Sequence, residues 1–132
     1  MRVTWNREDS VGIPLFDKHH MELFDIINDF TSGSESGHKK EATEVALTDL
    51  FKYAKEHFTA EEDAMKKVSY PKYEEHKTQH QDFVQIIQEV KAKMETDHEL
   101  ANEVLTILLS TWLKTHISDM DKEYTPYLKG KV

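Results

Sequence analysis

Residues 70–94 read YPKYEEHKTQHQDFVQIIQEVKAKM, and this stretch decides the fold. Its apolar and histidine positions recur at alternating intervals of three and four residues, which is the spacing of one helix face. These positions are Tyr73, His76, His80, Phe83, Ile87, Val90 and Met94. Proline suits the first turn of a helix, so Pro71 is expected at the start. The stretch therefore predicts an amphipathic helix over 71–95 with two histidines on its buried face.

Three other segments show the same helical spacing of apolar residues. They predict helices over about 15–31, 40–67 and 98–117, followed by a C-terminal extension over 118–129. The residue Asp97 is a suitable N-cap for the last of these helices. The tract TSGS at 31–34 is expected to form a loop, because the apolar spacing stops there.

The segment before the first helix has a different character. Residues 1–14 contain Gly12 and Pro14 and show no helical period, so they predict an extended arm that packs Trp5 against the helices. Short connections between four amphipathic helices favour antiparallel neighbours. The expected fold is all-α, an up-down-up-down four-helix bundle with an extended N-terminal arm. A chain of 132 residues, of which 38% are hydrophobic, fits one domain over 1–132.

The composition argues against several classes of function. A formal net charge of −8 repels nucleic-acid phosphates and anionic membrane surfaces. No apolar run approaches the length of a membrane span, and residues 1–9 lack the apolar stretch of a signal peptide. We therefore expect no nucleic-acid partner, no membrane insertion and a cytoplasmic location. Because the chain has no cysteine, any bound metal must be held by nitrogen and oxygen atoms.

Polar residues interrupt the apolar faces of the two central helices. The helix over 40–67 carries His57 and Glu61 in its apolar stripe, as the helix over 71–95 carries its two histidines. If these helices are antiparallel about a turn near residues 68–69, His57 is level with His80, and Glu61 with His76. The sequence thus predicts that the four side chains meet at one height in the core.

The outer helices contribute to the same height. One histidine near the start of the first helix and His116 near the end of the fourth lie at the end of the bundle where the central helices turn. Helical phase favours His20 over His19 for the inward position without settling the choice. Burying so many polar groups without partners would cost several kcal/mol, so something must satisfy them. A metal site does so best, and a hydrogen-bonded polar layer is the alternative.

Four motifs resemble those of the hemerythrin family, specifically its single-domain bacterial members, and together they cover nearly the whole chain. They are VGIPLFDKHHMELF at 11–24, HFTAEEDAM at 57–65, YPKYEEHKTQHQDF at 70–83 and WLKTHISDMD at 112–121. The resemblance implies a non-haem di-iron centre in which histidines bind the irons and two carboxylates bridge them. The ligands of one iron would be His76, His80 and His116, those of the other His20 and His57, and the bridges Glu61 and Asp121.

One implied ligand conflicts with regular helix geometry. Asp121 follows His116 by five residues, which is about 140° around an ideal helix, whereas Asp119 would be in phase. The family motif selects Asp121. Both agree if the helix contains a π-bulge between the two residues, an irregularity common at functional sites. We therefore expect a π-bulge there. His19 departs from the family motif, because the family usually has glutamine at this position.

The resemblance also implies a function. With a solvent-derived oxygen as a third bridge, counting the donor atoms around two octahedral irons leaves one position open, on the iron with two histidines. Molecular oxygen is expected to bind there reversibly. The protein would be an oxygen carrier, storage or delivery protein and not an enzyme. Apolar side chains next to the ligands, or one turn from them, are expected to wall the oxygen pocket: Leu23, Phe58, Trp112 and Leu113.

Three rival interpretations remain at this stage. A ferritin-like di-iron oxidase uses paired Glu-x-x-His motifs, which occur here only as Glu35/His38 and Glu95/His98, at helix ends away from the polar layer. An iron- or zinc-binding storage protein is the second rival, because nitrogen-rich sites also bind zinc well. A bundle that serves only protein interaction is the third, and it leaves the inward polar groups unexplained.

Overall fold

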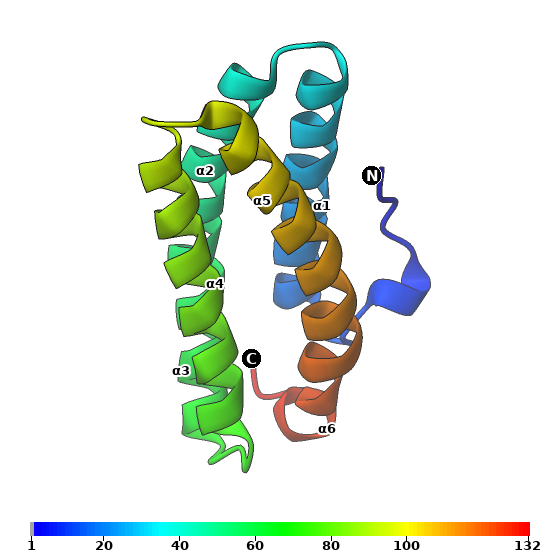
Figure 1. Cartoon of the computed structure of the whole chain (residues 1–132). Coiled ribbons are helices and arrows are strands. Elements are labelled where there is room, and N and C mark those ends of the chain that lie inside the picture. The colour runs from blue at the N-terminus through cyan, green and yellow to red at the C-terminus, as the bar shows by residue number, and fades with distance from the viewer. Residues whose placement is uncertain (1) are drawn as a thin grey trace.

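The described residues form four long helical segments that run antiparallel to their neighbours, with both chain ends alongside the bundle (Figure 1). The computed structural model describes residues 2–132, except for the side chains of residues 113–115 and 118. The first segment is α1 (Pro14–Glu35) and the third is α4 (Tyr73–Lys93). This arrangement confirms the predicted all-α four-helix bundle.

The second and fourth segments each contain a π-helical stretch. The second consists of α2 (Lys39–Tyr53), a π-helical stretch (Ala54–Phe58) and α3 (Thr59–Lys67). The fourth consists of α5 (His98–Trp112), a π-helical stretch (Leu113–Asp121) and, after a short turn, α6 (Thr125–Leu128). The second of these stretches is the irregularity expected before Asp121, whereas the first was not predicted.

The first helix extends past the expected loop at 31–34. Hydroxyl groups continue to donate hydrogen bonds to carbonyls one turn back, as Ser34 Oγ does to the Phe30 carbonyl oxygen at 2.8 Å. A Cβ at Gly33 would lie 2.8 Å from Cβ of Ala42, so glycine at this position lets α1 and α2 approach closely. The loop prediction was wrong because a small polar tract within a packed helix was interpreted as a helix end.

The ends of the later helices follow local chemistry. Helix α4 begins two residues after the expected start, and Pro71 lies in the preceding turn. Asp97 caps α5 as predicted, because its Oδ1 accepts a hydrogen bond from the Leu100 amide at 3.0 Å. None of the helices described is both long enough and apolar enough to cross a bilayer.

The N-terminal arm lies along α1 and completes the core. The Val3 backbone exchanges two hydrogen bonds with the Asn28 side chain, at 2.7 and 2.9 Å, and Trp5 packs partly buried against the main core. This confirms the predicted arm and the position of Trp5. A second apolar cluster includes Val11 and Phe16 from the N-terminal region and Tyr124 from the C-terminal region. The polar layer lies between the two apolar clusters, since its rings contact members of both.

Candidate metal centre

Seven buried polar side chains from all four helical segments meet in the polar layer, and none of them is more than 2% exposed. They are His20, His57, Glu61, His76, His80, His116 and Asp121. All seven side chains expected from the sequence are therefore brought together. His38 and His98 are exposed at helix starts and do not take part.

The donor atoms fall into two overlapping groups, and within each group they lie within 4.8 Å of one another. One group contains Glu61 with three histidines, and the other contains Glu61 and Asp121 with two. Glu61 belongs to both, because its Oε1 is 3.0 Å from Nε2 of His80 and its Oε2 is 3.2 Å from Nε2 of His57. The layer has room for two cations that share a carboxylate.

Asp121 also reaches both groups. Its Oδ1 lies 2.9 Å from Nε2 of His76 and 2.8 Å from Nε2 of His116, while its Oδ2 lies 3.0 Å from Nε2 of His20. Asp119 is exposed and has no place in this layer. The π-helical stretch carries both His116 and Asp121, and it turns Asp121 back toward the core.

These short distances do not have hydrogen-bond geometry, which makes the layer suitable for metal. The buried atoms without hydrogen-bond partners among the described residues include Nε2 of His76, Nε2 of His80, Nε2 of His116 and both carboxylate oxygens of Asp121. Buried polar atoms are otherwise nearly always paired, so a set of unpaired lone pairs that converges on common points calls for cations. Imidazole and carboxylate donors without thiolate suit iron, among other metals.

The charges of the layer depend on one another. Burial lowers the pKa of His76, but contacts with the carboxylates of Asp121 and Glu61 outweigh it and raise that pKa to about 10. Burial raises the pKa of Glu61, yet its histidine neighbours, His57 first, hold it well below its usual range. Burial and Glu61 also act to raise the pKa of Asp121, and the nearby histidines, His116 first, lower it overall. Without metal, the carboxylates stay ionised and protons reside on imidazoles.

A comparison with known families fits this geometry. Residues 11–128 match the model of the hemerythrin HHE cation binding domain. The chain belongs to the hemerythrin family. It is 30% identical to a bacteriohemerythrin of Clostridium acetobutylicum over 91% of this chain and 96% of the relative. Its identity to a bacteriohemerythrin of Methylococcus capsulatus is 28%, over 97% and 98% of the two chains.

Other hemerythrins are similar at the same level. A myohemerythrin of Theromyzon tessulatum is 32% identical over 97% of this chain and 92% of its own. The crystal structure of a wild-type hemerythrin superimposes with a TM-score of 0.85, at 27% identity, and covers 98% of this chain and 99% of that one. The family and the fold are therefore shown across nearly the whole chain.

In this hemerythrin, several outer contacts that were not predicted from the sequence orient the polar layer. Oε2 of Glu62 lies 2.8 Å from Nδ1 of His80, and Oε1 of Gln79 lies 3.3 Å from Nδ1 of His116. The Tyr124 hydroxyl donates a hydrogen bond to Oε2 of Glu61. A metal-binding histidine commonly needs an acceptor for its second nitrogen, and Glu62 supplies one for His80. That requirement was the available signal.

The two adjacent histidines of α1 differ in role. His20 is fully buried in the polar layer, as the helical phase favoured. His19 is partly buried outside the layer, and its Nδ1 lies 2.7 Å from Nδ1 of His57. The side chain of His19 therefore contacts the outer edge of His57, while Nε2 of His57 faces the layer.

Aromatic rings cover the layer on the side of the main core. Phe58 stacks on His80 with ring centroids 3.8 Å apart and an interplanar angle of 4°, and Trp112 stacks on His116 at 4.0 Å and 16°. Leu23 is 1% exposed in the same core cluster. The side chain of Leu113, the fourth residue expected in the oxygen pocket, lies outside the described residues.

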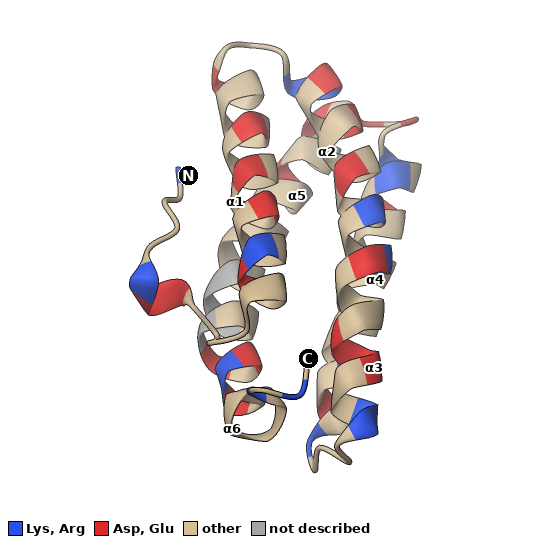
Figure 2. Ribbon diagram, turned by 180° about the vertical axis from the view of Figure 1, so that it is seen from behind, with Lys and Arg blue, Asp and Glu red and all other residues tan. Residues whose placement is uncertain are grey.

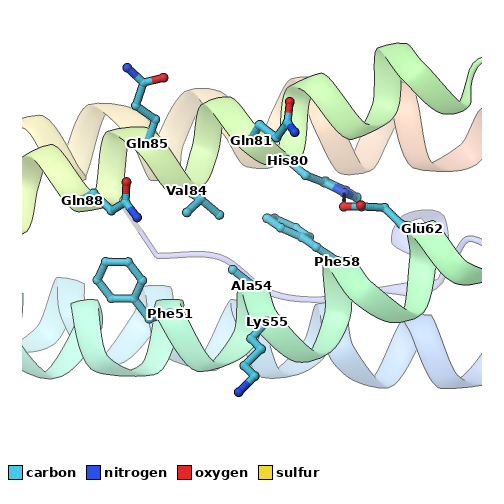
Figure 3. A pocket seen from close by; sticks show the side chains of 10 residues that line it. All are labelled: Phe51, Ala54, Lys55, Phe58, Glu62, His80, Gln81, Val84, Gln85 and Gln88. Carbon is cyan, nitrogen blue, oxygen red and sulfur yellow. Dashed lines mark hydrogen bonds and ion pairs between the residues drawn. The ribbon is translucent and has the colours of Figure 1, made fainter.

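Phe58 also faces an open pocket of about 590 Å³ between the second and third helical segments (Figure 3). In that view Phe58 and His80 lie side by side at one end, next to Glu62, whereas Phe51 lies at the other end. The pocket therefore reaches the outer edge of His80, and the ring of Phe58 covers the face of that imidazole.

Proposed function

We propose that this hemerythrin-family chain holds two iron ions in the polar layer and binds molecular oxygen there reversibly. His76, His80 and His116 would hold one iron and His20 and His57 the other, with Glu61 and Asp121 shared. The observation that carries this proposal is the pair of overlapping donor groups with shared carboxylates and unpaired buried atoms.

A bound iron pair would supply the two electrons needed for reversible oxygen binding. The rest of the work falls to the protein. The unequal division of histidines would leave the metal held by His20 and His57 with fewer donors, so a small molecule would bind on that side. Glu62 and the Tyr124 hydroxyl fix the orientation of His80 and Glu61 from outside the layer.

A reversible oxygen carrier, unlike an oxidase, must keep water and protons away from the bound oxygen. Phe58 and Trp112 supply flat apolar walls stacked directly on two donor histidines. We infer that Leu23, Phe58, Trp112 and Leu113 line the oxygen pocket.

The donor set is dominated by imidazole, unlike the four-carboxylate set of ferritin-like oxidases. A cytoplasmic location remains a prediction.

The test combines metal analysis with visible spectroscopy on protein prepared from its native host. We expect two irons per chain and an absorbance band that forms in air, vanishes when oxygen is removed, and returns over repeated cycles. His80→Asn should lower the iron content, while His38→Asn, which changes an exposed histidine, should keep it. One iron or none per chain, or a band that oxygen removal does not reverse, would contradict the proposal.

A further inference from the structure

A second polar feature lies outside the metal centre, in a pocket of about 330 Å³ between α1 and α2. Four carboxylates line it: Glu22, Asp25, Asp49 and Glu56. Lys52 is the only cation among the lining residues described. Acidic residues recur along both helices on this side of the molecule (Figure 2). The pocket therefore concentrates negative charge and attracts cations from solution.

Tyr53 connects this pocket to the metal centre. It lines the pocket, yet it is only 5% exposed, and its hydroxyl has no hydrogen-bond partner within the described part of the chain. Its ring stacks on that of His57, with centroids 5.0 Å apart and an interplanar angle of 23°. An unpaired buried hydroxyl beside an acidic pocket offers an oxygen donor to a passing cation or to its hydration water.

His19 provides a nitrogen donor on the same route. It lies one turn before Glu22 on α1, and both Glu22 and Glu56 interact with it electrostatically. Its Nδ1 is 2.7 Å from Nδ1 of His57. The pocket thus combines surface carboxylates with the phenol of Tyr53, and both Tyr53 and the neighbouring imidazole of His19 contact His57.

The other sides of the layer are less suited to admit a cation. Phe58 and Trp112 stack on the donor histidines on the core side, and Phe16 and Tyr124 pack against His57 and His76 on the opposite side. The larger pocket of Figure 3 also reaches His80, but one carboxylate, Glu62, and one ammonium group, Lys55, line it, so it carries no net charge to attract a cation.

We propose that the pocket between α1 and α2 is the entry site for ferrous ions, and that His19 passes each ion inward to His57. This proposal rests on the di-iron function proposed above. The carboxylates collect the hydrated ion by long-range attraction. The ion then exchanges water for the donors of His19 and Tyr53 before it reaches the layer. No electron is transferred in these steps, and the ion stays divalent.

The test is the rate at which metal-free protein takes up Co²⁺ in anaerobic stopped-flow experiments, with Fe²⁺ as the second probe. Co²⁺ reports binding through its own visible absorption and needs no oxygen. The entry variant is Glu22→Gln/Glu56→Gln, and the matched control is Glu89→Gln/Glu103→Gln, which removes the same charge from exposed positions on α4 and α5. We expect the entry variant to load about tenfold more slowly at low salt, with the difference shrinking at high salt.

A third variant separates His19 from simple charge. His19→Gln keeps a hydrogen-bonding group beside His57 but removes the nitrogen that binds metal. It should load slowly at every salt concentration and reach the same final metal content as the unaltered protein. Loading of both variants at the control rate would overturn the entry proposal while leaving the di-iron function intact. If even the unaltered protein takes up fewer than two ions, the di-iron function itself fails, and the entry proposal fails with it.

Discussion

Replacing Phe58 with alanine tests whether an aromatic wall protects the oxygen centre. Phe58 is 4% exposed and its ring lies flat on His80, with the rings of Phe83 and Trp112 each 5.6 Å away. On its other side is the open pocket shown in Figure 3. His80 lines this pocket at its edge, and Phe58→Ala would extend the pocket across the face of His80 toward the metal centre.

The cost to stability can be bounded from the packing. Phenylalanine-to-alanine changes in cores cost about 3 to 5 kcal/mol. The lower value applies here, because the open pocket lets water fill part of the space. For a chain of 132 residues the entropy of unfolding is about 0.28 kcal/mol/K, so 3 kcal/mol corresponds to a fall in melting temperature of about 11 °C for the metal-free protein.

The decisive measurement is the decay in air of the absorbance band of the oxygenated protein. We expect Phe58→Ala to lose the band about tenfold faster than the unaltered protein, equivalent to about 1.4 kcal/mol in the barrier. Phe51→Ala is the matched control, since Phe51 lines the same pocket at the end away from His80. If a folded, iron-loaded Phe58→Ala protein decays no faster than Phe51→Ala, the ring does not guard the centre.

Three further predictions follow from the same layer. Asp121→Ala should abolish the di-iron spectrum and Asp119→Ala should keep it; the opposite result would overturn the bridging role of Asp121. Iron-loaded protein should melt above metal-free protein by roughly 15 °C for each bound iron when free iron is about 1,000 times the dissociation constant, and equal melting temperatures would contradict a buried metal site. In metal-free protein, Glu61, Asp121 and His76 together should contribute most to stability between about pH 4 and 6.5. The lowered pKa values of Glu61 and Asp121 stabilise the folded protein above about pH 4, and this contribution is lost in acid. The raised pKa of His76 stabilises the folded protein below about pH 6.5, and this contribution is lost as the pH rises toward about 10. Melting curves across this range check the profile, and Asp121→Asn should flatten its alkaline side.

Much of the fold was predictable because helical periodicity reports burial directly. The stripe through His76, His80 and Phe83 is buried as the spacing required. Helix ends were predicted less well. The first helix continues through residues 31–34 because packing of Gly33 against Ala42 stabilises a tract whose composition favours a loop. Such packing depends on a neighbouring helix, and no local pattern in the sequence contains it.

The residues of the candidate site could be predicted because they lie at one height along the bundle and on the inward faces of their helices. The outer contacts were not, because they depend on which way each imidazole turns. Whether Nδ1 of His80 faces Glu62 or solvent is decided by the stacked ring of Phe58 and by the position of the neighbouring helix. The contact between His19 and His57 involves a residue, His19, that lies outside the apolar stripe of its helix, so periodicity gave no signal for it.

The π-helical stretch before Asp121 shows what the polar layer requires of the backbone. In a regular helix Asp121 would point about 140° away from His116, and the layer would contain five imidazoles with Glu61 as its bridging carboxylate. Without metal, such a layer would have only the carboxylate of Glu61 to stabilise its protonated histidines. With metal, it would have only one bridging carboxylate. The wider turn weakens local helix hydrogen bonding, but it returns a second carboxylate to contact with His20, His76 and His116. The stability that this turn and the unpaired donors remove must come from the apolar clusters on either side. The metal site therefore depends on the packing of the two apolar clusters that flank it.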